Sequence, residues 1–128
     1  MKKSGSLLAI ALATLIVFGV VCAGFAQSVN MPKTIIHHVT LQWKADAQAA
    51  DKQKVMTDLQ AILAEIKGVK NFWVKSLKVQ PEGYSQTFVV EFENQAALDA
   101  YAKHPKKEAW NKAYYAIRES SYNSVTTN

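Results

Sequence analysis

The sequence predicts an α+β domain in which an antiparallel β-sheet carries its helices on one face. Segments with strand-like alternation and segments with helical apolar spacing follow one another as strand, helix, strand, strand, helix, helix, strand. This order favours an antiparallel sheet with the helices gathered in one layer. The chain has 128 residues, of which 49% are hydrophobic and 20% charged, so it suits one domain and excludes a disordered or collagen-like protein.

The first 26 residues have the pattern of a secretory signal peptide. Lys2 and Lys3 provide a positive start, residues 7–21 form an uncharged apolar run, and Gly24-Phe25-Ala26 provides small residues before a cut. An uncleaved membrane anchor is the alternative, but a span needs about 20 apolar residues and this run is shorter. We therefore expect three parts: a signal peptide at residues 1–26, a linker at 27–33 and the domain at 34–128.

Export would place the protein in a periplasm or outside the cell, with membrane attachment only if the signal segment stays uncleaved. Cys22, the only cysteine, lies in that segment and does not follow the leucine and small residues of a lipoprotein site. The remaining 102 of 128 residues would fold without disulfides, so hydrophobic burial must stabilise them. Loss of Lys2 and Lys3 lowers the net charge from +5 to +3, and the remaining lysines are scattered, which argues against nucleic-acid binding.

Residues 34–43 predict the first strand, because apolar residues alternate with period two. One face of this strand is strongly apolar apart from a histidine and carries Ile35, His37, Val39, Leu41 and Trp43. The other face is mixed and carries Ile36, His38, Thr40 and Gln42.

The next change of period predicts a helix over residues 46–67. Its apolar stripe consists of Val55, Leu59, Ile62 and Ile66. Asp46 or Asp51 is expected to cap its start. Gly68 suits a left-handed stop at its end.

Two further strands are expected before the second helix. Residues 69–79 predict one strand, and a turn at Pro81-Glu82-Gly83 follows it. Residues 87–93 predict the other strand, with its most apolar face formed by Phe88, Val90 and Phe92.

The remaining elements are two helices and a last strand. Asn94 is expected to cap a helix whose inner residues are Ala97, Leu98 and Tyr101. His104-Pro105 ends that helix, and Pro105 suits the first turn of a further helix. The buried side of the further helix is expected at Trp110, Ala113, Tyr114 and Ile117. Residues 120–127 alternate weakly and predict the last strand.

One face of such a sheet is left without helices. It would carry residues such as Ile36 and Val89. A chain of this length without disulfides buries limited area alone. We therefore expect two copies to press these faces together in a symmetric homodimer.

Three segments of the chain resemble the stress-responsive α/β-barrel (Dabb) family. They are residues 34–44 (TIIHHVTLQWK), residues 88–92 (FVVEF) and residues 97–105 (ALDAYAKHP). The resemblance covers about residues 33 to 127. It implies a ferredoxin-like monomer, a dimeric α/β barrel and a pocket between sheet and helices. Members of that family include plant stress proteins and a polyketide cyclase.

The sequence departs from the cyclase pattern at its catalytic base. His104 and Pro105 match the His-Pro-x-His motif, but Lys107 replaces the second histidine, which is the general base of the cyclase. The acidic residue that orients this base aligns with Val125. A lysine with an ordinary pKa of about 10.4 is mostly protonated at neutral pH unless burial lowers that pKa. The cyclase reaction is therefore not expected here, and Lys107 is predicted to be a solvated cation on an exposed turn.

The pocket that the resemblance implies has six candidate lining residues: His37, Val39, Leu41, Tyr101, His104 and Trp110. His37 is either a buried histidine hydrogen-bonded to a neighbour or a pocket donor or base that titrates near neutral pH. Tyr101 either packs in the core with an outward hydroxyl or contributes to the pocket. His104 suits a partner for a helix C-terminus, and Trp110 suits the core.

No metal or cofactor is expected. His38 lies on the face opposite His37, at a dimer seam or in water, so the two neighbouring imidazoles diverge and could not share a metal. The sequence contains no glycine-rich phosphate loop, CxxC, HExxH or serine nucleophile elbow.

Three functions remain open from the sequence. The favoured one is a non-enzymatic homodimer that binds a small apolar or aromatic ligand in its pocket. The second is a small enzyme of the cyclase, isomerase or monooxygenase type that uses His37 or Tyr101. The third is a purely structural stress protein with a filled core.

Overall fold

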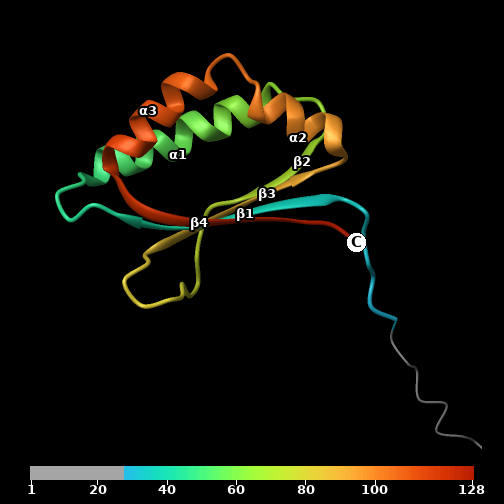
Figure 1. Ribbon diagram of the computed structural model, residues 1–128, viewed down its shortest axis with the longest axis horizontal. Helices are drawn as coiled ribbons and strands as arrows, with labels where there is room; N and C mark the ends of the chain where they lie inside the picture. Colours follow the sequence, from blue (N-terminus) through green and yellow to red (C-terminus); the bar gives the residue numbers. More distant parts are fainter. Residues whose placement is uncertain (1–27) are drawn as a thin grey trace, which may run out of the picture. The chain divides into compact units, whose positions relative to one another are not determined.

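The computed structural model describes residues 28–128, of which residues 31–128 form one compact unit (Figure 1). The predicted signal peptide, residues 1–26, lies outside the described residues. Among residues 28–128, no helix is long and apolar enough to cross a membrane.

The sheet consists of β1 (Ile35–Trp43), β2 (Val69–Trp73), β3 (Gln86–Phe92) and β4 (Arg118–Thr126). Its strands lie in the order β2-β3-β1-β4, and every neighbouring pair is antiparallel. The predicted antiparallel four-stranded sheet is therefore confirmed. β1 lies between β3 and β4, and β3 lies between β2 and β1, so the two strands with clear apolar alternation are the interior ones.

The helices α1 (Ala49–Ala64), α2 (Gln95–Ala102) and α3 (Lys107–Ile117) all cover the same face of the sheet (Figure 1). The core lies between these two layers. Its fully buried side chains come from both layers: Leu41, Leu59, Phe88, Val90 and Phe92. The helical spacing of residues 55–66 and the alternation of residues 35–43 thus meet in one core, as expected.

The helix ends confirm the predicted cap at Asn94 and correct two other predictions, since α1 ends at Ala64 and Gly68 lies in the turn that follows it. The side chain of Asn94 accepts a hydrogen bond of 3.0 Å from the backbone N–H of Ala97. Gly68 has a φ of +93°, and an added Cβ would lie 2.9 Å from the Cβ of Ala97. The predicted cap at Asp46 or Asp51 is wrong, because α1 begins after an extended Gln48, and Asp51 lies within its first turn.

The second strand ends at Trp73 instead of residue 79. The reason is that a side chain, in place of a backbone partner, takes the hydrogen-bonding groups of one residue in the neighbouring strand β3. Ser76 Oγ accepts a 2.8 Å hydrogen bond from the N–H of Thr87 and donates a 3.2 Å bond to its carbonyl. Beyond Trp73 the chain leaves the sheet, and Leu77 is 96% exposed in the loop that follows.

The face without helices, which we call the open face, is mixed, as the sequence of the first strand suggests. Ile36 and Val89 are half-buried there, and Trp73 and Tyr122 are exposed. Among its polar groups, Thr40 is buried and shares a 3.1 Å hydroxyl–hydroxyl hydrogen bond with Thr87. The open face therefore combines exposed aromatic rings with hydrogen-bonded hydroxyl groups, a composition found at protein interfaces.

Candidate ligand-binding site

A cavity of about 390 Å³ opens between the sheet and the helices α2 and α3. It is lined by residues of β1, α2, α3 and β4: His37, Tyr101, Ala102, Lys107, Trp110, Asn111, Tyr114, Tyr115, Arg118 and Asn123. This is where the sequence placed a pocket between sheet and helices. Four of these ten residues are tyrosines or tryptophan, and the charged side chains are those of Lys107 and Arg118.

Lys107 is not the solvated cation that the sequence suggested. Its Nζ lies 4.2 Å from the ring centroid of Tyr101 and 4.1 Å from that of Trp110, and it donates a 3.0 Å hydrogen bond to the Tyr101 hydroxyl. Burial lowers the pKa of Lys107 to about 8, because the charged form loses hydration. The two ring faces stabilise the ammonium that burial penalises. The side chain comes from the first residue of α3 and reaches the ring of Tyr101 on α2.

Tyr101 connects the cavity to the core. The residue is 5% exposed, and its ring packs 5.4 Å from that of Phe92 and 5.9 Å from that of His37, measured between centroids. Burial raises the pKa of Tyr101 well above its ordinary value. The hydroxyl therefore remains protonated and can both accept from Lys107 and donate to a ligand.

His37 lies half-buried on the helix-covered face of β1, as its position in the alternation predicts. Its Nδ1 is buried and has no hydrogen-bond partner within residues 28–128, so the sequence-based picture of a fully satisfied core histidine is not met at this atom. Burial first, and then the nearby charges of Lys107 and His38, lower the pKa of His37. The imidazole is thus neutral near pH 7 and offers an unpaired nitrogen at the cavity.

Arg118 is a site residue that the sequence did not reveal. Its guanidinium lies 4.6 Å from the ring centroid of Tyr115 and 5.2 Å from that of Tyr114, and it donates a 2.8 Å hydrogen bond to Ser121 Oγ. Its Nε is buried without a partner in the described part of the chain. Arg118 lies at the junction of α3 and β4 and belongs to no sequence motif. Only the packing of α3 on the sheet therefore shows that it lines the cavity.

The other predicted pocket residues divide between the cavity wall and the core. Trp110 lines the cavity, but its indole N–H donates a buried 2.8 Å hydrogen bond to the carbonyl of Val55. Val39 and Leu41 are 2% and 0% exposed and lie in the core beneath the helices, away from the cavity wall. His104 also lies outside the wall. Its Nε2 is 3.3 Å from the carboxylate of Glu65.

The cavity holds no carboxylate that could serve as a base or as a metal ligand. The sheet register places Val125 directly opposite His37, so the position that aligns with the acidic partner of the cyclase base carries no ionisable group. Among residues 28–128, no group of three or more His, Cys, Asp or Glu side chains could hold a metal ion.

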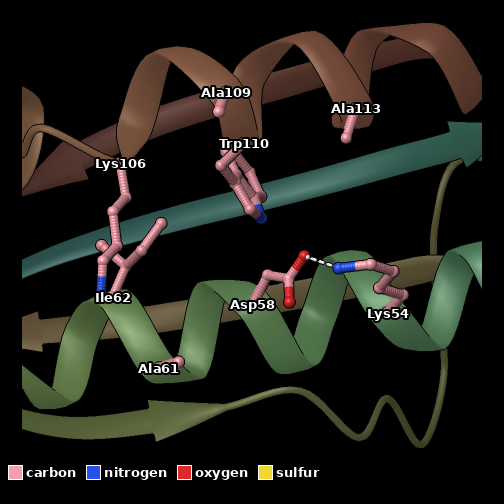
Figure 2. Close-up of a pocket in the computed structure, with 8 residues that line it drawn as sticks. All are labelled: Lys54, Asp58, Ala61, Ile62, Lys106, Ala109, Trp110 and Ala113. Carbon is pink, nitrogen blue, oxygen red and sulfur yellow. Dashed lines mark hydrogen bonds and ion pairs between the residues drawn. The ribbon is translucent and has the colours of Figure 1, made fainter.

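A second cavity, of about 430 Å³, lies between α1 and α3 (Figure 2). Figure 2 shows Trp110 projecting from α3 between the two helices, above the ion pair of Lys54 and Asp58 at 2.6 Å. The rest of the wall includes Ala61, Ala109 and Ala113. Both charges of the ion pair are already matched, so this groove offers fewer unpaired polar groups than the cavity at His37.

We expect the free energy of unfolding to decrease as the pH falls below about 6.5, the ordinary pKa of histidine. Because the pKa of His37 is lowered in the folded protein, the unfolded chain accepts a proton that the folded state resists. Urea unfolding between about pH 4.5 and 7.5 measures this slope. The variant His37→Gln should flatten it, whereas His38→Gln on the opposite face should retain most of it. An unchanged slope in His37→Gln would contradict the assignment.

Solved structures of other proteins share the fold of this chain. The chain is 24% identical to a Dabb family protein with a ferredoxin-like fold from Mesorhizobium loti, with a TM-score of 0.62 over 74% of this chain and 96% of that one. It is 22% identical to a dimeric ferredoxin-like protein of unknown function from Jannaschia sp. CCS1, with a TM-score of 0.65 over 74% and 99%. It is 12% identical to a hydroxynitrile lyase from Passiflora edulis, with a TM-score of 0.66 over 74% and 93%. These similarities confirm the predicted ferredoxin-like fold.

The family follows from the sequence match. No protein with curated information matches this chain significantly. The family model of the stress-responsive A/B barrel domain, Dabb, matches residues 35–122, which run from β1 to the middle of β4. Since this match covers well over half of the chain, the protein belongs to the stress-responsive A/B barrel domain family.

Proposed function

We propose that this protein is an exported homodimer that binds a small apolar or aromatic molecule in the cavity between the sheet and α2 and α3. The observation that carries the proposal is the aromatic wall of that cavity, formed in part by Tyr101, Trp110 and Tyr114. Its volume of about 390 Å³ lies within the range of about 300–1,000 Å³ that ligand pockets occupy. Apolar walls with a few convergent polar groups are typical of such pockets.

The arrangement supports binding over cyclase-type catalysis. At the position of the cyclase base stands Lys107, and with a pKa of about 8 its side chain is mostly protonated near pH 7. Only the minor fraction present as free amine could abstract a proton. Val125 lies opposite His37, so no carboxylate orients either side chain.

Dimerisation is supported by the open face and by the dimeric protein of similar fold described above. Trp73 and Tyr122 are 50% and 61% exposed on that face, and large exposed aromatic rings favour association. Export is supported by the signal pattern of residues 1–26.

The proposal is tested with 4-nitrobenzamide and 4-nitrobenzoate, whose nitroaromatic rings quench tryptophan fluorescence on contact. The chain has three tryptophans, of which Trp110 lines the cavity, Trp43 is buried in the core and Trp73 lies on the open face. We expect saturable quenching by at least one probe, abolished in Trp110→Phe and retained in Trp73→Phe. If neither probe binds, the protein is better described as a structural stress protein with no ligand.

An enzyme that transfers protons is the second candidate. It is favoured by the neutral His37 with an unpaired Nδ1, next to a tyrosine hydroxyl that is bonded to Lys107. The similarity to a hydroxynitrile lyase shows the fold alone. Release of cyanide from an aromatic α-hydroxynitrile, lost in His37→Ala, would establish this candidate, whereas our proposal expects no turnover.

A further inference from the structure

The charges that face the cavity are of one sign. Lys107 and Arg118 both line it, and no aspartate or glutamate does. The ion pairs within residues 28–128 join Lys54 to Asp58 and join Glu65 to His104 and Lys106, so neither cavity cation belongs to one. The field inside the cavity is therefore positive.

Both cations contact only uncharged groups, so neither has a counter-charge beside it. The neighbours of Lys107 are a tyrosine hydroxyl and two ring faces, and those of Arg118 are two ring faces and a serine hydroxyl. Taking a cation out of water without a counter-charge is costly. The lowered pKa of Lys107 has this physical origin. An anion that entered the cavity would remove part of the cost, which favours an anionic ligand over a neutral one of equal shape.

The rest of the wall indicates what the anion is attached to. Tyr101, Trp110 and Tyr114 present aromatic rings, of which the last two are stacked with centroids 4.8 Å apart. Because these rings already contact each other and Lys107, a flat apolar body would meet their edges and the ring of Tyr115, which is 52% exposed. The planar guanidinium and the ammonium together suit a carboxylate, because charge-assisted hydrogen bonds to carboxylates are strong and arginine can form two of them.

We propose that the cavity selects a small aromatic carboxylate, with its carboxylate directed to Lys107 and Arg118 and its ring against the aromatic wall. This inference rests on the proposed binding function and narrows it to one chemical class. In this proposal Lys107, which replaces the histidine base of the cyclase, supplies the positive charge that selects the ligand.

Isothermal titration calorimetry with 4-nitrobenzoate and 4-nitrobenzamide tests the inference, because the two probes share a ring and a shape and differ in charge. We expect the carboxylate to bind at least about tenfold more tightly at pH 7, equivalent to about 1.4 kcal/mol. Lys107→Met should remove most of this preference, because the carboxylate then loses its charged partner in the cavity wall. Lys107→Arg should keep the preference. Lys112→Met, which removes an exposed lysine from the same helix, should behave like the wild type.

The outcomes separate this inference from the function on which it rests. Equal affinity for both probes overturns the inference and leaves the binding function standing. Binding of neither probe overturns both. A carboxylate preference that persists in the double variant with Lys107→Met and Arg118→Met also overturns the inference, because the charge would then come from elsewhere. Circular dichroism of each variant establishes that it is folded.

Discussion

Val89→Arg should convert the proposed homodimer into a monomer. Val89 lies on β3 in the interior of the sheet, half-buried on the open face and paired with His38 of β1 and Trp73 of β2. In a symmetric dimer formed through this face, the substitution would introduce an arginine from each copy. Like charges placed together at an interface, without partners, cost several kcal/mol. We expect the dimer dissociation constant to rise by at least about 100-fold.

Sedimentation equilibrium of the wild type and of Val89→Arg over a range of protein concentrations measures this change. Ala64→Arg is the matched control, because Ala64 is exposed on α1, away from the open face, and the substitution should leave the mass unchanged. The monomeric variant should retain its circular dichroism, since an arginine on the open face can extend into water. A wild-type protein that sediments as a monomer would refute the dimer, and a dimer that survives Val89→Arg would place its interface elsewhere.

Trp110→Ala should lower the free energy of unfolding by about 3–5 kcal/mol, the usual cost of truncating a large buried aromatic residue. Trp110 is 5% exposed, stacks on Tyr114 and donates its indole N–H to the carbonyl of Val55. It therefore joins α3 to α1 across the core. The carbonyl of Val55 lies inside α1, where the helix supplies another donor, so the loss comes mainly from the cavity that is created.

Two further variants on α3 separate packing from hydrogen bonding. Trp110→Phe retains most of the buried ring and loses the indole donor, so we expect a smaller loss of about 1–2 kcal/mol. Tyr115→Ala removes a ring that is 52% exposed on the same helix and should cost about 1 kcal/mol or less. Guanidinium unfolding at a fixed protein concentration measures all three, since the stability of a dimer depends on concentration. Equal losses in Trp110→Ala and Tyr115→Ala would contradict the assigned role of Trp110.

Local patterns in the sequence correctly predicted much of the fold. The alternation of residues 35–43 and the helical spacing around Leu59 produced the expected strand and helix, because burial on one side imposes a period on each element. Asn94 determined the start of α2 through its side-chain hydrogen bond, and Gly68 allowed a left-handed turn between α1 and β2. The end of β2 was missed, since it depends on Ser76 bonding to Thr87, eleven residues away.

The candidate site shows where sequence reasoning stops. The sequence by itself determined the family, the fold, the position of His37 on the covered face and the replacement of the cyclase base by Lys107, since each is a matter of residue type and period. Only the tertiary structure decided that Lys107 lies against the rings of Tyr101 and Trp110 and that Arg118 lines the same cavity. The physical reason is that the burial and charge environment of a side chain depend on neighbours that the packing of α3 on the sheet brings together.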